Sequence, residues 1–245
     1  MKLKILSYNI HKGFTIGNTD FILHQIRQAL RELDADILFL QEVVGDHSEN
    51  KCKIPEWKTA IQFEYLADSL WPHFAYGKNA VYPEGHHGNA ILSKFPIVAW
   101  ENHVISTNRL EHRGLLKTRV HIPDLGHDIL LANTHLDLTQ TGRDKQTKMI
   151  IDHMIPEKDI PWILVGDFND WNKKISPTIE SKLGAKEAFK QLYGRYPLTF
   201  PSLMPMLSLD RVYLHKIKPV DGYALTDKKW RKLSDHLPLY VEIEI

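Results

Sequence analysis

The 245-residue chain, 43% of it apolar, is long enough to bury a sizeable core, and we take residues 1–245 as one domain. Its 31 lysines and arginines against 30 aspartates and glutamates leave a net charge of +1, so no global basic field indicates nucleic acid as the partner. Cys52 is the single cysteine, which excludes an intramolecular disulfide and a cysteine-rich zinc site and favours the reducing cytoplasm. Ser7, Tyr8 and Asn9 interrupt the first apolar stretch, so we expect neither a signal sequence nor a transmembrane segment there.

Short β-like runs alternate with amphipathic helical stretches along the chain. The expected strands are 3–8, 37–40, 88–93, 97–105, 115–122, 127–133, 161–165, 209–214, 220–224 and 239–245, and the expected helices are 21–33, 57–70 and 142–155. Turn residues separate the four strands between 88 and 133, which predicts a β-meander. Because parallel and antiparallel signals are mixed, we expect an α/β fold in which two sheets share one core with helices outside.

Several apolar runs end in a carboxylate, a carboxamide or an imidazole, the pattern of a site at the rim of buried strands. These residues are Asn9 after the first strand, Glu42 after "DILFLQ", Asp167 and Asn169 after "WILV", and Asp235 and His236 in "SDH". Carboxylate oxygens suit Mg²⁺ or Mn²⁺, and a divalent ion beside an Asp or His activates water against a phosphate ester. The set therefore predicts a metal-dependent phosphoesterase.

Each of these side chains also has an ordinary structural interpretation. Glu42 would be a solvated loop residue, Asn9 a turn residue, Asp167 with Asn169 an Asx turn, His236 a cap or core residue, and Asp210 a salt-bridge partner of Arg211. His135 would be a structural histidine satisfied by Asp137, and Arg113 a surface ion pair with Glu111. The structural interpretations of His236 and Asp210 are each reasonable singly but not jointly, whereas those of His135 and Arg113 stay open.

Eight motifs in chain order resemble those of the endonuclease/exonuclease/phosphatase superfamily, and the resemblance covers nearly the whole chain. They are "SYNIHKG", "LQEV", "HHGNAILSKFPI", "HRGLLKTRV", "NTHLD", "GDFND", "LDRVY" and "SDHLPL". Within that superfamily the chain is most similar to small bacterial stand-alone members near the sphingomyelinase-like and lipid-remodelling branches. The resemblance implies a four-layered α/β sandwich of two packed mixed sheets flanked by helices.

The resemblance also implies roles for particular residues. Glu42 would bind Mg²⁺ or Mn²⁺ with Asn9 and Asp235 beside it, Asp167 would orient the attacking water, and the Asn169 amide would donate to a phosphate oxygen. His236, paired with Asp210, would face the phosphate, and His135 would be a general acid in a nuclease-like branch. The Arg113 guanidinium would fork onto a non-bridging phosphate oxygen. His86 and His87 fall near the site in the family, although solvent exposure is the stronger expectation for them.

The substrate remains open at the level of sequence. Six cations near these motifs would steer a polyanion, namely Lys173, Lys174, Lys228, Lys229, Arg231 and Lys232. The apolar segment 199–207, with Trp171 and Trp230, would touch acyl chains, stack on bases or be buried in the fold. The near-neutral charge slightly favours a lipid head group or small-molecule ester, with peripheral membrane contact and a monomeric chain. A nuclease and a non-catalytic phosphate-binding module are the alternatives.

Overall fold

The computed structural model describes residues 1–17, 19–47, 61–83, 85–108 and 112–245. The strands are β1 (Lys2–Asn9), β2 (Ile37–His47), β3 (His73–Tyr82), β4 (Gly85–Ser93), β5 (Ile97–Val104), β6 (Gly114–Ile122), β7 (His127–His135), β8 (Trp162–Asp167), β9 (Lys186–Glu187), β10 (Asp210–His215), β11 (Lys218–Ala224) and β12 (Leu239–Glu244). The α-helices are α1 (Leu23–Leu33), α3 (Gln62–Ala67), α4 (Gln140–Met154), α5 (Ser176–Leu183), α6 (Ala188–Tyr193) and α7 (Trp230–Leu233). None of the helices in these ranges is long and apolar enough to cross a membrane.

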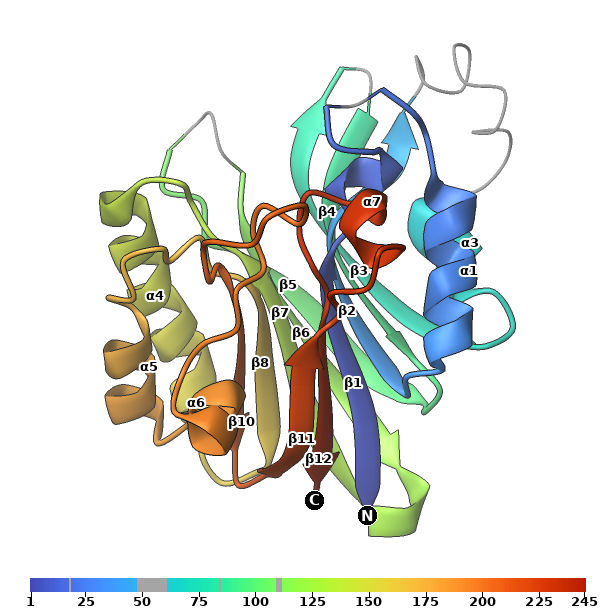
Figure 1. Cartoon of the computed structure of the whole chain (residues 1–245). Helices are drawn as coiled ribbons and strands as arrows, with labels where there is room; N and C mark the ends of the chain where they lie inside the picture. The colour runs from blue at the N-terminus through green and yellow to red at the C-terminus, as the bar shows by residue number, and fades with distance from the viewer. Residues whose placement is uncertain (18, 48–60, 84, 109–111) are drawn as a thin grey trace.

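The described strands form two mixed six-stranded sheets (Figure 1). The first has the order β11-β12-β1-β2-β4-β3 and the second the order β5-β6-β7-β8-β10-β9. Each sheet has one parallel pair near its centre, β1 with β2 and β7 with β8, and antiparallel strands on both sides. Helices α1 and α3 lie outside the first sheet, and α4 and α5 lie outside the second. The predicted α/β sandwich is confirmed.

The central strands are apolar on both faces because each sheet is covered on both sides. On β1, Ile5 belongs to the core between the sheets, whereas Leu6 belongs to the core under α1. On β8, Ile163 faces the other sheet and Leu164 faces the helices α4 and α5. This alternation of buried side chains explains why β8 reads in the sequence as an unbroken apolar run.

The predicted strands lie where they were expected along the chain, but one predicted connection between neighbouring strands is wrong. The expected meander is divided between the sheets, because β4 pairs with β2 and β3 in the first sheet whereas β5, β6 and β7 pair in the second. The half-exposed edge strand β3 was not predicted, since its sequence mixes polar and apolar residues. The helix expected at 57–70 spans Gln62–Ala67, and residues 57–60 of that prediction lie outside the described residues.

Asn133 on β7 hydrogen-bonds the two sheets to each other directly below the edge where β1, β2, β7 and β8 end. Its fully buried amide Nδ2 donates to the carbonyls of Leu40 and Ala90 in the other sheet, each at 2.9 Å. Its Oδ1 accepts from the Gln41 amide at 2.8 Å. Because a buried polar group left without a partner is costly, this amide holds the sheets in one relative position.

We predict that Asn133→Leu lowers the free energy of unfolding by about 2–4 kcal/mol, because it removes three buried hydrogen bonds between the two sheets. Urea unfolding followed by circular dichroism measures the change. The matched control is Asn172→Leu, which removes an exposed amide that bonds only Gln140 among its described contacts. Equal stability losses in the two variants would contradict a special role for Asn133.

Candidate active site

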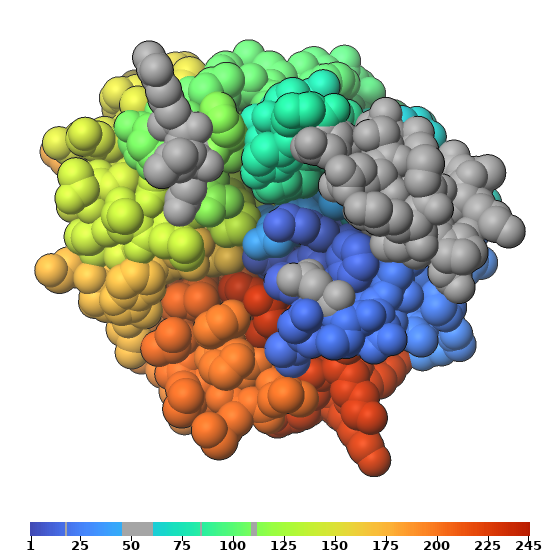
Figure 2. Space-filling view, turned by 90° about the horizontal axis from the view of Figure 1, so that it is seen from above, coloured from blue at the N-terminus to red at the C-terminus, as the bar shows by residue number. Residues whose placement is uncertain are grey.

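The carboxyl ends of the two parallel strand pairs bring the predicted site residues to one edge of the sandwich. Asn9 of β1 is opposite Gln41, which directly precedes Glu42. His135 of β7 is opposite Asp167 of β8, and Asp167 is in turn opposite Asp210 of β10. Seen from above, this edge is hollowed between the N-terminal, central and C-terminal segments of the chain (Figure 2). Side chains from distant parts of the sequence therefore share one depression.

Two backbone features aim the side chains at this edge. The pairing of β2 with β4 shifts register between Leu40 and Val43, and Glu42 within this bulge has a φ of 55°. Such a bulge turns a side chain out of the regular alternation of the strand. Gly166 lies so close to β7 that a Cβ atom there would be 1.9 Å from the Thr134 carbonyl oxygen, and its φ is 152°. A glycine is therefore required just before Asp167.

Asp167 is the residue on which the other buried polar groups converge. Its Oδ2 accepts from the Asn9 amide at 3.2 Å, and lies 3.4 Å from His135 Nε2 and 3.5 Å from His236 Nε2. Its Oδ1 accepts from the backbone N–H of Asn169 at 3.0 Å. Three of these partners come from different elements, so the position of this carboxylate is fixed from several sides.

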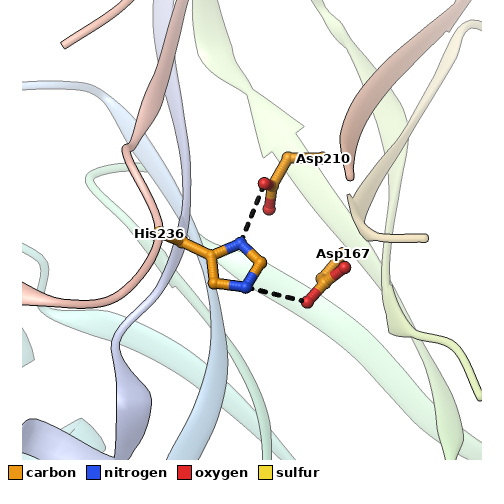
Figure 3. Close-up of side chains that lie close together, drawn as sticks. All are labelled: Asp167, Asp210 and His236. Carbon is orange, nitrogen blue, oxygen red and sulfur yellow. Dashed lines mark hydrogen bonds and ion pairs between the residues drawn. The ribbon is translucent and has the colours of Figure 1, made fainter. Parts of the chain in front are cut away.

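His236 and Asp210 form the predicted pair. His236 Nδ1 lies 3.0 Å from Asp210 Oδ2, and Figure 3 shows the imidazole between the Asp210 and Asp167 carboxylates. The alternative of a salt bridge between Asp210 and Arg211 is wrong, because the Arg211 guanidinium donates to the carbonyls of Ser208, Asp210 and Asp170. Asp210 is thus available to hold His236 in one orientation.

Burial and mutual electrostatic interaction shift the pKa values of Asp167 and His236. Burial raises the pKa of Asp167 to about 6, with the positive charge of His236 opposing the rise and Asp210 adding to it. Burial alone would lower the pKa of His236, but the carboxylates of Asp210 and Asp167 outweigh it and raise that pKa to about 10. At neutral pH His236 is therefore an imidazolium between two carboxylates.

His135 is neutral, in contrast to His236. Burial holds the pKa of His135 well below its ordinary value, with the charges of Arg113 and His236 adding to the effect. Its expected rival partner Asp137 is used elsewhere, since the Asp137 carboxylate accepts from Thr139 and Asn108. A neutral imidazole beside Asp167 positions that carboxylate better than it delivers a proton.

Two predicted substrate contacts, Asn169 and Arg113, lie at this edge. The Asn169 amide Nδ2 donates to the Leu136 carbonyl at 3.0 Å, which leaves its second hydrogen for another acceptor. Arg113 is partly buried, and its charge lowers the pKa of both His135 and His87. The ion pair proposed for it with Glu111 lies outside the described residues.

Glu42 and Asp235 form a second cluster, the acidic rim, with His11 between them. His11 Nδ1 lies 3.5 Å from Asp235 Oδ1 and 4.0 Å from Glu42 Oε2. The Asn9 amide joins the rim to the buried group, because Nδ2 also lies 3.3 Å from Glu42 Oε1. Although burial opposes it, the charges of Lys12 and His11 hold the pKa of Glu42 below its usual value.

Sequence reasoning missed His11 and Lys12, although both lie inside the quoted motif "SYNIHKG". Both have positive φ angles, and the Gln62 amide fixes the Lys12 carbonyl at 2.7 Å. Their position directly after Asn9 was the available signal. The turn that presents them was not visible in the residue pattern, because it contains no glycine at the two left-handed positions and Lys12 is not a residue that favours that conformation.

The acidic rim fits a divalent ion by its donor chemistry. Glu42 and Asp235 offer two carboxylates that remain partly open to solvent, the buried Asn9 offers a carboxamide oxygen beside them, and the His11 imidazole lies between the carboxylates. Hard oxygen donors of this kind suit Mg²⁺ or Mn²⁺. Asp167, Asp210 and His236 also lie close enough to hold an ion, but the His236 ring nitrogens lie 3.0 Å from Asp210 Oδ2 and 3.5 Å from Asp167 Oδ2, and the carboxylates of the acidic rim are more open to solvent.

The other residues expected to contact substrate, His87, Trp171 and Trp230, differ in how far they are buried. Burial, with the charge of Lys12 adding to it, lowers the pKa of His87 to about 4, and its ring stacks on Tyr82. Trp230 is 1% exposed and packs on Tyr8, so burial, one of the alternatives expected for it, is confirmed. Trp171 is 46% exposed with the buried Arg143 guanidinium under its ring at 4.3 Å.

Comparison with known proteins places the chain in a family context. Residues 6–236 match the model of the Endonuclease/Exonuclease/phosphatase family. The chain is 42% identical over 244 residues to an uncharacterized protein of Escherichia coli (strain K12) named YbhP, and the match covers 99% of this chain and 96% of that protein.

Solved structures with different ligands have the same fold. A mannosyl-6-phosphatase of Bacteroides thetaiotaomicron, Bt3783, superposes with a TM-score of 0.76 at 20% identity, covering 99% of this chain and 100% of that one. D. rerio TDP2 complexed with a single-strand DNA product superposes with a TM-score of 0.72 at 20% identity, covering 100% of this chain and 99% of that one. At this identity the likeness establishes the fold and leaves the substrate open.

We predict that Glu42→Gln weakens Mg²⁺ binding by at least about tenfold, because it removes one of the two charged oxygen donors of the acidic rim. Titration calorimetry measures the affinity. Glu32→Gln, which alters an exposed carboxylate paired with Lys229, should leave it unchanged. The assignment fails if Glu42→Gln binds Mg²⁺ as tightly as the wild type does.

Proposed function

The chain belongs to the Endonuclease/Exonuclease/phosphatase family of hydrolases, and on that premise we propose that it is a divalent-metal-dependent phosphoesterase. The observation that carries the proposal is the convergence of two imidazoles and an amide, all within 3.5 Å, on one carboxylate oxygen of Asp167. A non-catalytic phosphate binder would have no need of such a carboxylate beside the Asp210–His236 pair. The proposed reaction is attack of water on a phosphate ester.

Asp167 is the proposed base. A pKa near 6 leaves this carboxylate ionised at neutral pH and still able to accept a proton, as a general base requires. The water oxygen forms a bond to phosphorus, its proton passes to Asp167, and the bond from phosphorus to the leaving oxygen breaks. Asn9 and His135 hold Asp167 in place for this transfer.

His236, Asn169 and Arg113 are the proposed contacts of the phosphate oxygens. The His236 imidazolium keeps its charge because Asp210 binds Nδ1, and its Nε2 side faces the depression with Asp167. Positive charge and hydrogen-bond donors fixed beforehand stabilise the extra negative charge of the transition state. An ion held by Glu42 and Asp235, with Asn9 beside them, would supply further positive charge to the phosphate.

The proposed substrate is a lipid or other small phosphate ester. The charge of +1 gives no general attraction for a polyanion, and apolar side chains of the segment 199–207 are exposed beside the site. A sugar phosphatase and a DNA-binding relative both have this fold, so the surface around the site has to decide the substrate. The runner-up is a nuclease, which the exposed Trp171 would favour as a stacking platform. We propose action in the cytoplasm as a monomer.

We predict that Asp167→Asn and His236→Ala each lower kcat by about a hundredfold or more on bis(p-nitrophenyl) phosphate with Mg²⁺. His135→Ala should cost less, because a neutral imidazole that positions Asp167 is replaced in part by water. His127→Ala changes an exposed histidine on the far end of β7 and serves as the control. If His135→Ala is as damaging as the other two, His135 acts as a general acid and the nuclease-like mechanism applies.

We also predict faster turnover of a phospholipid or small phosphate ester than of plasmid DNA. Binding of nucleic acid gains most of its strength from neutralised phosphates, so a nuclease should lose affinity steeply as salt rises. Rates on DNA, phospholipid vesicles and a sugar phosphate across a salt series make the comparison. Rapid DNA cleavage with a steep salt dependence, and no turnover of the other two substrates, would replace this proposal with the nuclease.

A further inference from the structure

Three apolar side chains project from the loop of residues 198–207, here called the apolar loop. Leu203 is 59% exposed, Met204 65% and Met206 59%. Single exposed apolar residues are common on protein surfaces, but a contiguous group of them indicates a surface that binds something.

The apolar loop is ordered by its own hydrogen bonds. Thr199 and Phe200 donate to the Leu207 carbonyl at 2.9 and 3.1 Å, and Met206 and Leu207 donate back to Phe200. The Arg231 guanidinium donates to the Leu203 carbonyl at 2.7 Å. Arg231, one of the cations expected to steer substrate, thus has a structural role in holding this loop. The exposed side chains are therefore held outward by a fixed backbone.

The same loop is attached to the candidate active site. The Ser202 N–H donates to the Asp235 carbonyl at 2.8 Å, and its hydroxyl donates to the Ser234 carbonyl at 2.6 Å. The Phe200 ring centroid lies 5.0 Å from that of His236. In Figure 2 the orange segment around residue 200 lies beside the central depression. Whatever binds the apolar loop is thus brought next to His236.

A cationic cavity of about 830 Å³ adjoins the apolar loop. Leu198 and Pro205 of the loop line it, together with Lys173, Lys190 and Arg195, and there is no carboxylate among the described residues of its lining. Lys190 is 3.8 Å from Glu180, so its charge is partly compensated. The apolar loop and the cationic cavity therefore form one continuous surface.

We propose that the apolar loop and the cationic cavity dock the protein onto an anionic phospholipid membrane. The loop's aliphatic and thioether side chains would enter the boundary with the acyl chains, and Lys173, Lys190 and Arg195 would contact headgroup phosphates. Single-stranded nucleic acid fits this surface less well, because its bases stack on aromatic faces and the exposed tip is Leu203, Met204 and Met206. The proposal extends the proposed function, since a lipid ester would reach His236 from the docked surface.

Cosedimentation with vesicles in EDTA tests docking without turnover, so a failure of the catalytic proposal leaves the result readable. Wild-type protein should bind vesicles of phosphatidylcholine mixed with phosphatidylglycerol more tightly than vesicles of phosphatidylcholine alone. The double variant Leu203→Asp with Met204→Asp should lose about tenfold or more of that affinity. Val98→Asp, at a position 55% exposed on β5, is the matched control and should bind as the wild type does.

The charge of the cavity provides a second, independent variant. Lys173→Glu with Arg195→Glu should reduce binding to the anionic vesicles and leave binding to phosphatidylcholine unchanged. Thermal melting checks that all variants are folded. The proposal is overturned if the wild type does not sediment with anionic vesicles, or if the loop variant binds them as well as Val98→Asp does. It is also overturned if single-stranded DNA, tested in the same buffer, is the only ligand whose binding the loop variant abolishes.

Discussion

The contact of the two sheets through Asn133 is the constraint on which the site depends. The carbonyls that its amide binds belong to Leu40 and Ala90, and Leu40 is two residues before Glu42. Asn133 itself is two residues before His135. This connection therefore fixes β2, which carries Glu42, against β7, which ends at His135 beside Asp167. Hydrophobic packing alone would allow the sheets to slide, whereas an amide with directed hydrogen bonds allows one register.

Charge is distributed over the site in two ways. In the buried group, the His236 imidazolium lies between the Asp210 and Asp167 carboxylates and offsets part of their negative charge. At the acidic rim, Glu42 and Asp235 face the single His11 ring at 3.5–4.0 Å and remain accessible to solvent. Burying or crowding carboxylates is costly unless a cation compensates them. The buried group thus contains a cation, whereas the carboxylates of the acidic rim are accessible to a cation from solvent. The Asn9 amide keeps the two clusters adjacent.

The central strands and the meeting of the site residues at one edge were easier to predict from the sequence than the division into two sheets and the turns around the site. Asn9, Glu42, His135 and Asp167 each follow a buried run, and parallel strands place such ends at one edge, so their meeting followed from the pattern. The division of the strands between two sheets was not predictable in the same way, because the short turn between β4 and β5 fits a connection within one sheet as well as one between two sheets. His11 and Lys12 were missed because a left-handed turn presents them, and the sequence left Trp230 open because one pattern fits both a buried and an exposed tryptophan.

The proposed mechanism requires phosphate and a metal ion to occupy the two adjacent clusters described above. A crystal structure of the protein with Mg²⁺ and inorganic phosphate would locate both. We expect the ion on the Glu42 and Asp235 carboxylates, and the phosphate within hydrogen-bond distance of His236 and Asn169 with Asp167 beside it. An ion bound instead by Asp167, Asp210 and His236, or a phosphate bound away from this edge of the sandwich, would contradict it.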